Sequence, residues 1–217
     1  MAIEHKDIAA IREDYAMGSL SELDVLENPT QQFQVWFEQA LSAQVLEPNA
    51  MVLATINNQG YPSTRVVLLK DIKAEGFSFF TNYTSQKGQD LARNSKVSLL
   101  FFWGELQRQV RIEGDVEFLP KDDSDEYFAS RPKGSQIGAW SSPQSQIIAS
   151  RSILEDRVKE KEIEFEQMET IPRPSFWGGY LVKPFRMEFW QGRSSRLHDR
   201  IVYQKENDTW TKNRLAP

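Results

Sequence analysis

The sequence contains no cysteine and only two histidines, His5 and His198, among 217 residues. Without cysteine the chain can form no disulfide, no thiolate nucleophile and no cysteine-ligated metal site, which is consistent with a reducing compartment. The two histidines are too far apart for a recognisable metal motif, so we expect no metal. No segment reads as a signal peptide, and the cytoplasm is the expected location.

The chain also lacks an excess of positive charge and a long apolar run. Its 26 Lys and Arg residues stand against 31 Asp and Glu residues, a formal net charge of -5. This balance argues against a general nucleic-acid or anionic-membrane partner. The longest strongly apolar stretch, residues 97–103, is too short to span a bilayer. Since the usual glycine-rich nucleotide-binding loops are absent as well, any anionic ligand must be bound by a local cluster of basic side chains.

Strand patterns dominate the rest of the chain. We predict strands at residues 50–56, 61–70, 77–83, 96–103, 108–119, 176–190, 196–204 and 209–215. Helices are predicted from an N-cap at Thr30 and at residues 85–94, 122–130 and 145–169. Short turns between most strands favour antiparallel pairing, so we expect a mainly β protein, a closed or partly closed barrel with peripheral helices. Residues 1–30 are expected to form a mobile arm or lid, and residues 31–217 one domain.

Basic residues flank one apolar strand. Arg65 and Lys70 bracket the sequence V-V-L-L, and Lys87 follows the next strand. Guanidinium and ammonium groups in such positions suit a phosphate, but an ordinary strand with solvated ends fits the same pattern. Alternation puts Arg65 and Lys70 on opposite faces of an unbroken strand, so one ligand contacts both only across a bulge or at a strand end.

Two further groups of residues carry polar chemistry. Tyr127 and Arg131 share one helix face by their i, i+4 spacing, and with Ser135 they form a candidate phosphate cradle; the alternative is an arginine that interacts with the helix dipole. Residues 189–200 gather three arginines around His198, a side chain that can transfer protons near neutral pH. A structural role for this histidine is equally compatible with the pattern.

Several motifs in order resemble the pyridoxamine/pyridoxine 5'-phosphate oxidase family. They are R-V-V-L-L-K at 65–70, F-F-T-N at 79–82, Y-F-A-S-R-P at 127–132, S-Q-I-G-A-W at 135–140, S-F-W-G-G-Y at 175–180 and R-L-H-D-R at 196–200. The resemblance runs from about residue 12 to the C-terminal N-R-L-A-P. It implies an FMN-binding antiparallel split β-barrel that forms a homodimer with FMN at the interface.

The resemblance also implies roles for individual residues. The positions that match flavin contacts are Arg65, Val66, Val67, Leu68, Leu69, Lys70, Phe80, Thr81, Gln86, Lys87, Gln109, Gln144, Ser145, Trp190 and Arg200. The positions that match substrate contacts are Arg12, Tyr15, Lys70, Tyr127, Arg131, Ser135, Arg196 and His198. Arg196 and His198 would act at the substrate ring as the catalytic residues. Gln86 departs from the family, which commonly has arginine there, and weaker binding of the flavin phosphate is expected.

The activity implied by the resemblance is oxidation of pyridoxine 5'-phosphate or pyridoxamine 5'-phosphate to pyridoxal 5'-phosphate. FMN would carry the redox chemistry, and dioxygen would be reduced to hydrogen peroxide, with ammonia released from the amine. Two alternatives stay open: a flavin reductase of the same fold, and a flavin-binding or pyridoxal-phosphate carrier without turnover. A nucleic-acid module is disfavoured by the charge.

Overall fold

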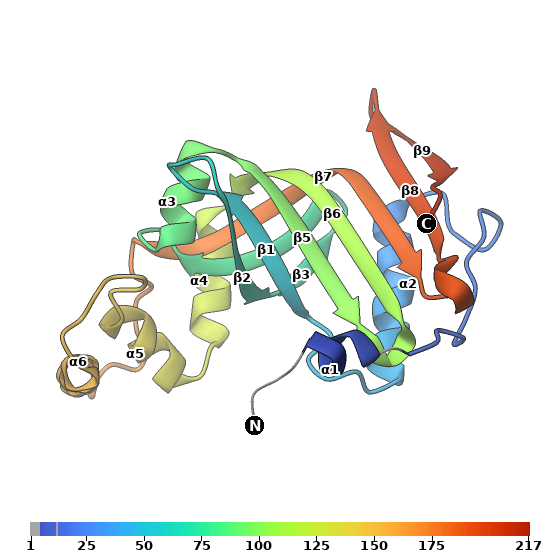
Figure 1. Ribbon diagram of the computed structural model, residues 1–217. Coiled ribbons are helices and arrows are strands. Elements are labelled where there is room, and N and C mark those ends of the chain that lie inside the picture. Colours follow the sequence, from blue (N-terminus) through green and yellow to red (C-terminus); the bar gives the residue numbers. More distant parts are fainter. Residues whose placement is uncertain (1–4, 12) are drawn as a thin grey trace. The chain divides into compact units, whose positions relative to one another are not determined.

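The computed structural model describes residues 5–11 and 13–217 (Figure 1). The strands are β1 (Ala50–Ile56), β2 (Pro62–Leu68), β3 (Asp71–Lys73), β4 (Gly76–Asn82), β5 (Lys96–Trp103), β6 (Arg108–Phe118), β7 (Trp177–Gln191), β8 (Asp199–Glu206) and β9 (Thr209–Arg214). The helices are α1 (His5–Ala10), α2 (Pro29–Ser42), α3 (Gln86–Arg93), α4 (Lys121–Ser130), α5 (Lys133–Ser141) and α6 (Arg151–Glu164). Two single turns of 3₁₀ helix complete the elements: η1 (Gly104–Leu106) and η2 (Ser194–Arg196).

The chain divides into two compact units. The pocket unit consists of Asn49–Leu99 and Glu113–Phe185. The terminal unit contains the described residues of Met1–Pro48 together with Leu100–Ile112 and Arg186–Pro217. The predicted division into an arm of residues 1–30 and a domain of residues 31–217 stays a prediction.

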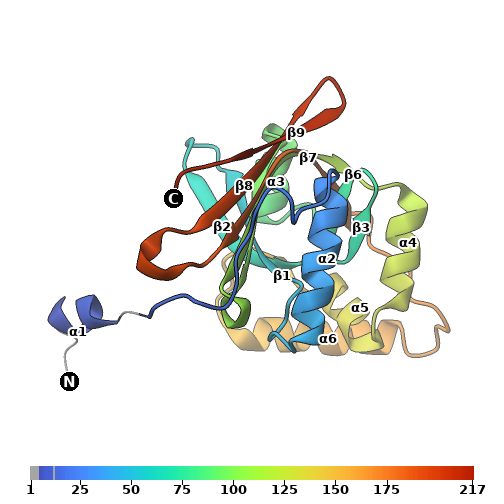
Figure 2. The ribbon, with the colours of Figure 1, turned by 90° about the vertical axis from the view of Figure 1, so that its right-hand side faces the viewer.

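The strands pair antiparallel, as the short turns predict. In the pocket unit β1 pairs with β2, with Ala50 opposite Leu68, and β4 pairs with the first half of β7, with Phe77 opposite Val182. In the terminal unit the second half of β7 pairs with β8, and β8 with β9, which Figure 2 shows as a twisted ribbon near the C-terminus. The strand order is β2-β1-β5-β6-β7-β4-β3, and β8 adds to β7.

Helix α2 begins earlier than the sequence pattern predicts. The N-cap is Asn28 rather than Thr30: its side-chain oxygen accepts hydrogen bonds from the backbone N–H groups of Thr30, at 2.9 Å, and Gln31, at 3.2 Å. Pro29 then occupies the first helical turn, where a missing N–H costs nothing. The apolar face of the helix buries Phe33 completely, and this ring lies 4.8 Å from that of Phe101 in the terminal unit.

The segment before α2 is attached to the C-terminal hairpin. Leu20 is buried, and its backbone N–H donates to Asp199 at 3.0 Å. The Arg214 guanidinium donates to both Glu22 and Asp199. The hydrogen bond from Arg214 lowers the pKa of Glu22. Burial raises the pKa of Asp199, but the hydrogen bonds it accepts from Leu20, Arg214 and Arg193 outweigh this effect and hold it below its usual value. Among the described residues, no helix is long and apolar enough to cross a membrane, and the cytoplasmic location stays a prediction.

The helices of the pocket unit differ from the prediction in two places. Helix α5 was not expected, because its sequence holds two glycines with low helix propensity; burial of Ile137 and packing against α6 stabilise it (Figure 1). The helix predicted at residues 145–169 was wrong at both ends, since α6 covers only Arg151–Glu164. Ser145 has a φ of 71°, in the left-handed region, which a helix cannot continue through.

The last predicted hairpin is correct in its turn but not in its start. Asn207 and Asp208 both have positive φ, at 47° and 64°, which is the geometry of a two-residue hairpin turn. The strand predicted from residue 196 begins only at Asp199. Ser195 and Arg196 adopt left-handed backbone angles, with φ of 59° and 62°, and form η2 instead. Strand β3 is not among the predicted strands, because its three residues are too few to show an alternating pattern.

A glycine pair in β7 lets the Tyr83 side chain lie directly on the strand. A Cβ built on Gly178 would come within 2.1 Å of Tyr83 Oη. The Tyr83 hydroxyl donates to the carbonyl of Gly179 at 3.4 Å, and burial raises the pKa of this phenol. No larger residue fits at position 178 without moving the aromatic ring.

Gly178→Ala is therefore expected to lower the free energy of unfolding by about 1–3 kcal/mol through overpacking. Gly134→Ala is the matched control, because a Cβ on this glycine of α5 meets nothing within 4 Å; better helix propensity should stabilise by up to about 1 kcal/mol. Urea denaturation measures both variants. Equal effects would contradict the steric explanation.

Candidate functional site

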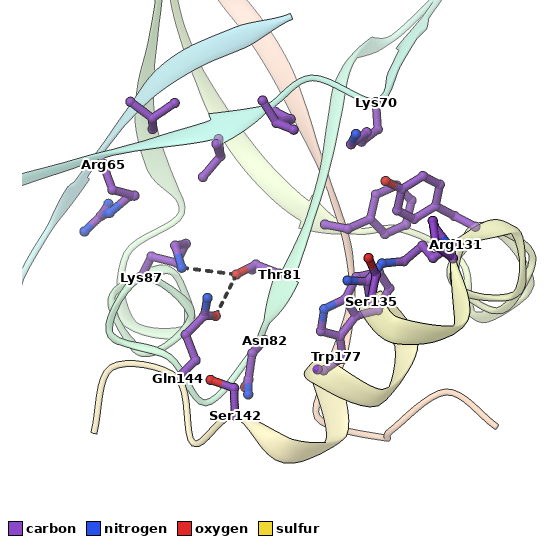
Figure 3. Close-up of a pocket in the computed structure, with 18 residues that line it drawn as sticks. Arg65, Lys70, Thr81, Asn82, Lys87, Arg131, Ser135, Ser142, Gln144 and Trp177 are labelled. Carbon is purple, nitrogen blue, oxygen red and sulfur yellow. Dashed lines mark hydrogen bonds between the residues drawn. The ribbon is translucent and has the colours of Figure 1, made fainter. Parts of the chain in front are cut away.

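One cavity of about 840 Å³ lies in the pocket unit, lined by the 18 residues drawn in Figure 3. It brings together residues predicted for the cofactor and for the substrate: Arg65, Val66, Val67, Leu68, Lys70, Phe80, Thr81, Lys87, Tyr127, Arg131, Ser135 and Gln144. The basic side chains form two groups on opposite sides of the cavity (Figure 3). We call Arg65 and Lys87, with Thr81, the Arg65–Lys87 cluster, and Lys70, Tyr127, Arg131 and Ser135 the Arg131 cluster.

The structure answers how Arg65 and Lys70 reach one cavity despite strand alternation. β2 ends at Leu68, and Lys70 lies beyond it, where its backbone N–H donates to the carbonyl of Ser78 in β4 at 2.9 Å. The break in the strand releases Lys70 from the alternating pattern. Of the two geometries that the sequence left open, the strand end is therefore the correct one.

The Arg65–Lys87 cluster holds two cations that are partly removed from water. Lys87 Nζ lies 3.2 Å from Thr81 Oγ1 and 3.4 Å from Ser85 Oγ, and its side chain is buried in α3. Burial lowers the pKa of Lys87, and the charge of Arg65 lowers it further. Burial also lowers the pKa of Arg65, against the opposing effect of Asp90. The Thr81 hydroxyl donates to Gln144 Oε1 at 3.4 Å, which links the cluster to the loop after α5.

The Arg131 cluster contains a cation without a complete set of partners. The Nη1 atom of Arg131 is buried and has no hydrogen-bond partner. It is the one buried side-chain N or O atom of this kind among the described residues. The guanidinium carbon lies 4.6 Å from the centre of the Trp177 ring, and burial lowers the pKa of Arg131. A buried donor of this kind is costly unless a ligand atom accepts from it.

Neighbouring groups of the Arg131 cluster suit an anion. Lys70 Nζ lies 5.9 Å from the centre of the Tyr127 ring, and Tyr127 stacks on Phe80 at 3.9 Å. Ser135 lies in the first turn of α5, and the N-terminal turn of a helix favours negative charge. Two cations, two hydroxyl groups and this helix end can therefore bind one phosphate.

Several predicted residues lie outside this cavity. In the pocket unit Leu69 is buried, Gln86 donates its amide to Asp90 at 2.8 Å, and Ser145 is exposed in the loop before α6. The terminal unit contains Tyr15, Gln109, Trp190, Arg196, His198 and Arg200. Arg12 lies outside the described residues. The roles expected for all of these residues stay predictions.

His198 has a defined orientation in the terminal unit. Its Nδ1 accepts a hydrogen bond from the backbone N–H of Arg193 at 3.1 Å. In the neutral ring the proton is consequently on Nε2, which makes Nε2 a hydrogen-bond donor. The rings of Trp190 and Tyr15 lie 4.6 Å and 5.9 Å from the imidazole. Arg200 is held by Glu188, whose carboxylate accepts from its Nε at 2.8 Å.

The sequence analysis missed six residues that line the cavity: Asn82, Pro132, Gly138, Ala139, Ser142 and Trp177. All but Ser142 lie inside motifs quoted for the resemblance, so the motifs themselves were the available signal. Ser142 follows the unpredicted helix α5, and no local pattern marked it.

Comparison with known proteins gives the family. A family model described as pyridoxamine 5'-phosphate oxidase matches residues 37–163, and a second, described as the pyridoxine 5'-phosphate oxidase C-terminal dimerisation region, matches residues 177–217. The chain belongs to the pyridoxamine 5'-phosphate oxidase family. The pyridoxine/pyridoxamine 5'-phosphate oxidase of Trichormus variabilis is 56% identical over 213 residues, which cover 98% of this chain and 99% of that one. The enzyme of that name from Salinibacter ruber is 50% identical over 212 residues, covering 97% and 99% of the two chains.

Solved structures of related proteins share the fold. PhzG from Burkholderia lata, in complex with tetrahydrophenazine-1-carboxylic acid, has a TM-score of 0.85 at 30% identity and covers 91% of this chain and 98% of its own. An FMN-binding protein of Nostoc punctiforme related to this family has a TM-score of 0.66 at 16% identity, with 92% and 100% covered. The mainly β, antiparallel split-barrel fold is thereby confirmed.

Replacing Lys87 by methionine should stabilise the ligand-free protein. Because the pKa of Lys87 is lower in the folded chain than in the unfolded one, the unfolded chain binds the proton more tightly. Folding stability therefore rises with pH from this lowered pKa up to the ordinary lysine value, and below that window the penalty is fully present. We expect Lys87→Met to raise the Tm of the ligand-free protein by a few degrees at neutral pH, measured by differential scanning calorimetry.

The exposed Lys96, which pairs with Asp115, provides the control. Lys96→Met should leave the Tm nearly unchanged. A lower Tm for Lys87→Met would show that the hydrogen bonds of Lys87 outweigh its loss of hydration.

Proposed function

We propose that this chain oxidises pyridoxine 5'-phosphate and pyridoxamine 5'-phosphate to pyridoxal 5'-phosphate with bound FMN. Dioxygen is the final electron acceptor and hydrogen peroxide the product, and ammonia is released when the substrate is the amine. The observation that carries the proposal is the presence of two separate cationic clusters in one cavity, one for each of two phosphate groups. The names of relatives that are 50–56% identical over nearly the whole chain support the same activity.

The Arg65–Lys87 cluster fits the phosphate of FMN. Its two cations are fixed by Thr55, Ser63, Thr81 and Ser85 rather than free in solvent. Residues 66–68 line the cavity beside it, as the resemblance implies for flavin contacts. When bound, FMN supplies the two-electron redox chemistry that no side chain can provide. The protein's task is to bind the phosphate, orient the ring and exclude competing reactions.

The Arg131 cluster fits the phosphate of the substrate. The unpartnered Nη1 of Arg131 gains an acceptor when a phosphate binds, and Lys70, Tyr127 and Ser135 supply further donors. Since the two phosphates are held at different places, the substrate has one orientation, and its reactive carbon is positioned by binding energy remote from the chemistry.

Residues outside the two clusters complete the proposal. Arg196 clamps the substrate ring, and His198 acts as a hydrogen-bond donor through Nε2. The flavin is contacted by five further residues: Gln109, Gln144, Ser145, Trp190 and Arg200. The bound substrate is covered by Arg12 and Tyr15. We also propose a homodimer with FMN at its interface, which the match to a C-terminal dimerisation region supports.

The alternatives differ in what they require of the cavity. A flavin reductase of this fold needs no second phosphate cluster, and a carrier needs no turnover. The 30% identical PhzG structure holds tetrahydrophenazine-1-carboxylic acid, a ligand without phosphate. In this chain the Arg131 cluster, with its unpartnered donor in the cavity, favours a phosphorylated substrate.

An anaerobic absorbance spectrum tests the proposal directly. Protein reconstituted with FMN is mixed with pyridoxine 5'-phosphate, and in a second cuvette with pyridoxamine 5'-phosphate. We expect the flavin band to bleach and to return when air is admitted, with formation of hydrogen peroxide. Bound flavin that never bleaches with either compound would leave the fold assignment intact and exclude the oxidase, in favour of the reductase or carrier.

Arg131→Ala tests the substrate cluster separately from the cofactor. Loss of a buried charge-assisted contact to phosphate should raise the KM for pyridoxine 5'-phosphate about 100-fold. The affinity for FMN should change by no more than about twofold, since Arg131 lies in the other cluster. Steady-state kinetics and flavin fluorescence titration measure the two quantities. Lys133→Ala, a neighbouring exposed cation outside the cavity, is the control; an unchanged KM in Arg131→Ala would exclude the assigned role.

A further inference from the structure

A buried carboxylate lies beside Arg65 of the Arg65–Lys87 cluster. Asp90 in α3 is completely buried, with its side chain 0% exposed. Its Oδ2 accepts a hydrogen bond from the hydroxyl of Thr55 at 2.8 Å and lies 3.7 Å from Arg65 Nη2. Neither Thr55 nor Asp90 lines the cavity, so neither contacts a ligand there directly.

Thr55 joins this carboxylate to Arg65. Its Oγ1 donates to Asp90 and accepts from Arg65 Nη1 at 2.7 Å, so one hydroxyl connects the anion and the cation. Thr55 is itself buried, with 1% of its surface exposed. A second support for the guanidinium comes from Ser63 Oγ, which accepts from Nη2 at 2.8 Å. Arg65 is thereby fixed at both terminal nitrogens.

The other oxygen of Asp90 is occupied by a neutral group. Gln86, one turn earlier in α3, donates its amide to Oδ1 at 2.8 Å. Because this partner carries no charge, the negative charge of Asp90 remains available to Arg65. A carboxylate buried at this point also offsets the repulsion between Arg65 and Lys87 in the ligand-free protein.

We infer that Thr55 and Asp90 are positioning residues for Arg65 at the phosphate end of the cavity. The Thr55 hydroxyl orients the guanidinium, and the Asp90 carboxylate, held by Gln86, fixes the hydroxyl. This inference rests on the proposed function insofar as the phosphate is that of FMN. It assigns to two residues outside the cavity a contribution to phosphate affinity that is separate from their contribution to folding.

If only the negative charge of Asp90 mattered, its effect on phosphate affinity would be the opposite of the one inferred here. A carboxylate near a bound phosphate repels it, so removal of Asp90 would strengthen binding if only net charge mattered. The Thr55 hydroxyl separates the two effects, because its removal changes no charge. Thr55→Val deletes the link, and Thr55→Ser retains the hydroxyl while removing only a methyl group.

The experiment compares FMN with riboflavin, which lacks the phosphate. Flavin fluorescence titrations of the full-length, flavin-free protein give both dissociation constants. We expect Thr55→Val to weaken FMN binding about tenfold while riboflavin binding changes by no more than about twofold. Thr55→Ser should return the FMN affinity to within about twofold of the original. A merely structural role would weaken both ligands together.

A double-mutant comparison tests whether Thr55 acts through Arg65. In an Arg65→Ala background Thr55→Val should have no further effect on FMN affinity. Thr64→Val, on the other face of β2 and outside the cavity, is the matched control. Asp90→Asn provides a second variant in case Thr55→Val does not fold, and it too should weaken FMN relative to riboflavin.

The outcomes separate this inference from the proposed function. FMN that fails to bind the unaltered protein would overturn the proposed function and this inference with it. FMN that binds, with an unchanged FMN-to-riboflavin ratio in both Thr55→Val and Asp90→Asn, would overturn only the positioning role. Tighter FMN binding by Asp90→Asn would show that net charge rather than orientation governs the cluster.

Discussion

The juxtaposition of Arg65 and Lys87 is the constraint on which the cavity depends. Two cations that are partly removed from water repel each other, and the lowered pKa of Lys87 records both the burial and the charge of Arg65. The surrounding residues answer this cost in two ways: hydroxyl groups fix each cation, and Asp90 supplies one buried negative charge. The remaining positive charge is available to an anionic ligand, so the site is ordered for phosphate before phosphate binds.

The same reasoning applies to Arg131, with a different solution. Here the guanidinium lies against the Trp177 ring, and no buried carboxylate is paired with it in the part of the chain that the structure describes. Aromatic contact tolerates a cation with little hydration, and it leaves Nη1 with an unused donor. The charge of the Arg65–Lys87 cluster is thus partly balanced by the Asp90 carboxylate, whereas the Arg131 cluster has no such internal anion among the described residues and depends on a bound ligand for one. An exchangeable anionic ligand gains most from the second arrangement, because it supplies the acceptor that Arg131 Nη1 lacks.

Local patterns predicted the strands well and the residues between them poorly. β1 and β5 have their predicted bounds because each is a mostly apolar segment that ends at turn-forming residues. α5 could not be predicted, since burial against α6 and not propensity stabilises it. At the site, the resemblance supplied most cavity residues, but only the observed end of β2 showed how Arg65 and Lys70 share one cavity. Asp90 left no signal at all, because a single aspartate in a polar helix looks solvated until its burial is known.

The loop before β8 shows why irregular segments escape sequence patterns. Ser195 and Arg196 occupy left-handed backbone angles, which cost about 1–3 kcal/mol for each residue. Asp199 offsets part of this cost, since it accepts from Arg193 at 2.8 Å and from Arg214 at 2.7 Å. Because Arg193 is fixed, its backbone N–H donates to His198 Nδ1 in one geometry. The orientation of the imidazole, and with it the direction of the Nε2 donor, is therefore fixed. In a regular strand, alternation would decide only which face of the sheet the His198 side chain lies on. The strained turn instead orients its ring through hydrogen bonds, which only the folded terminal unit can form.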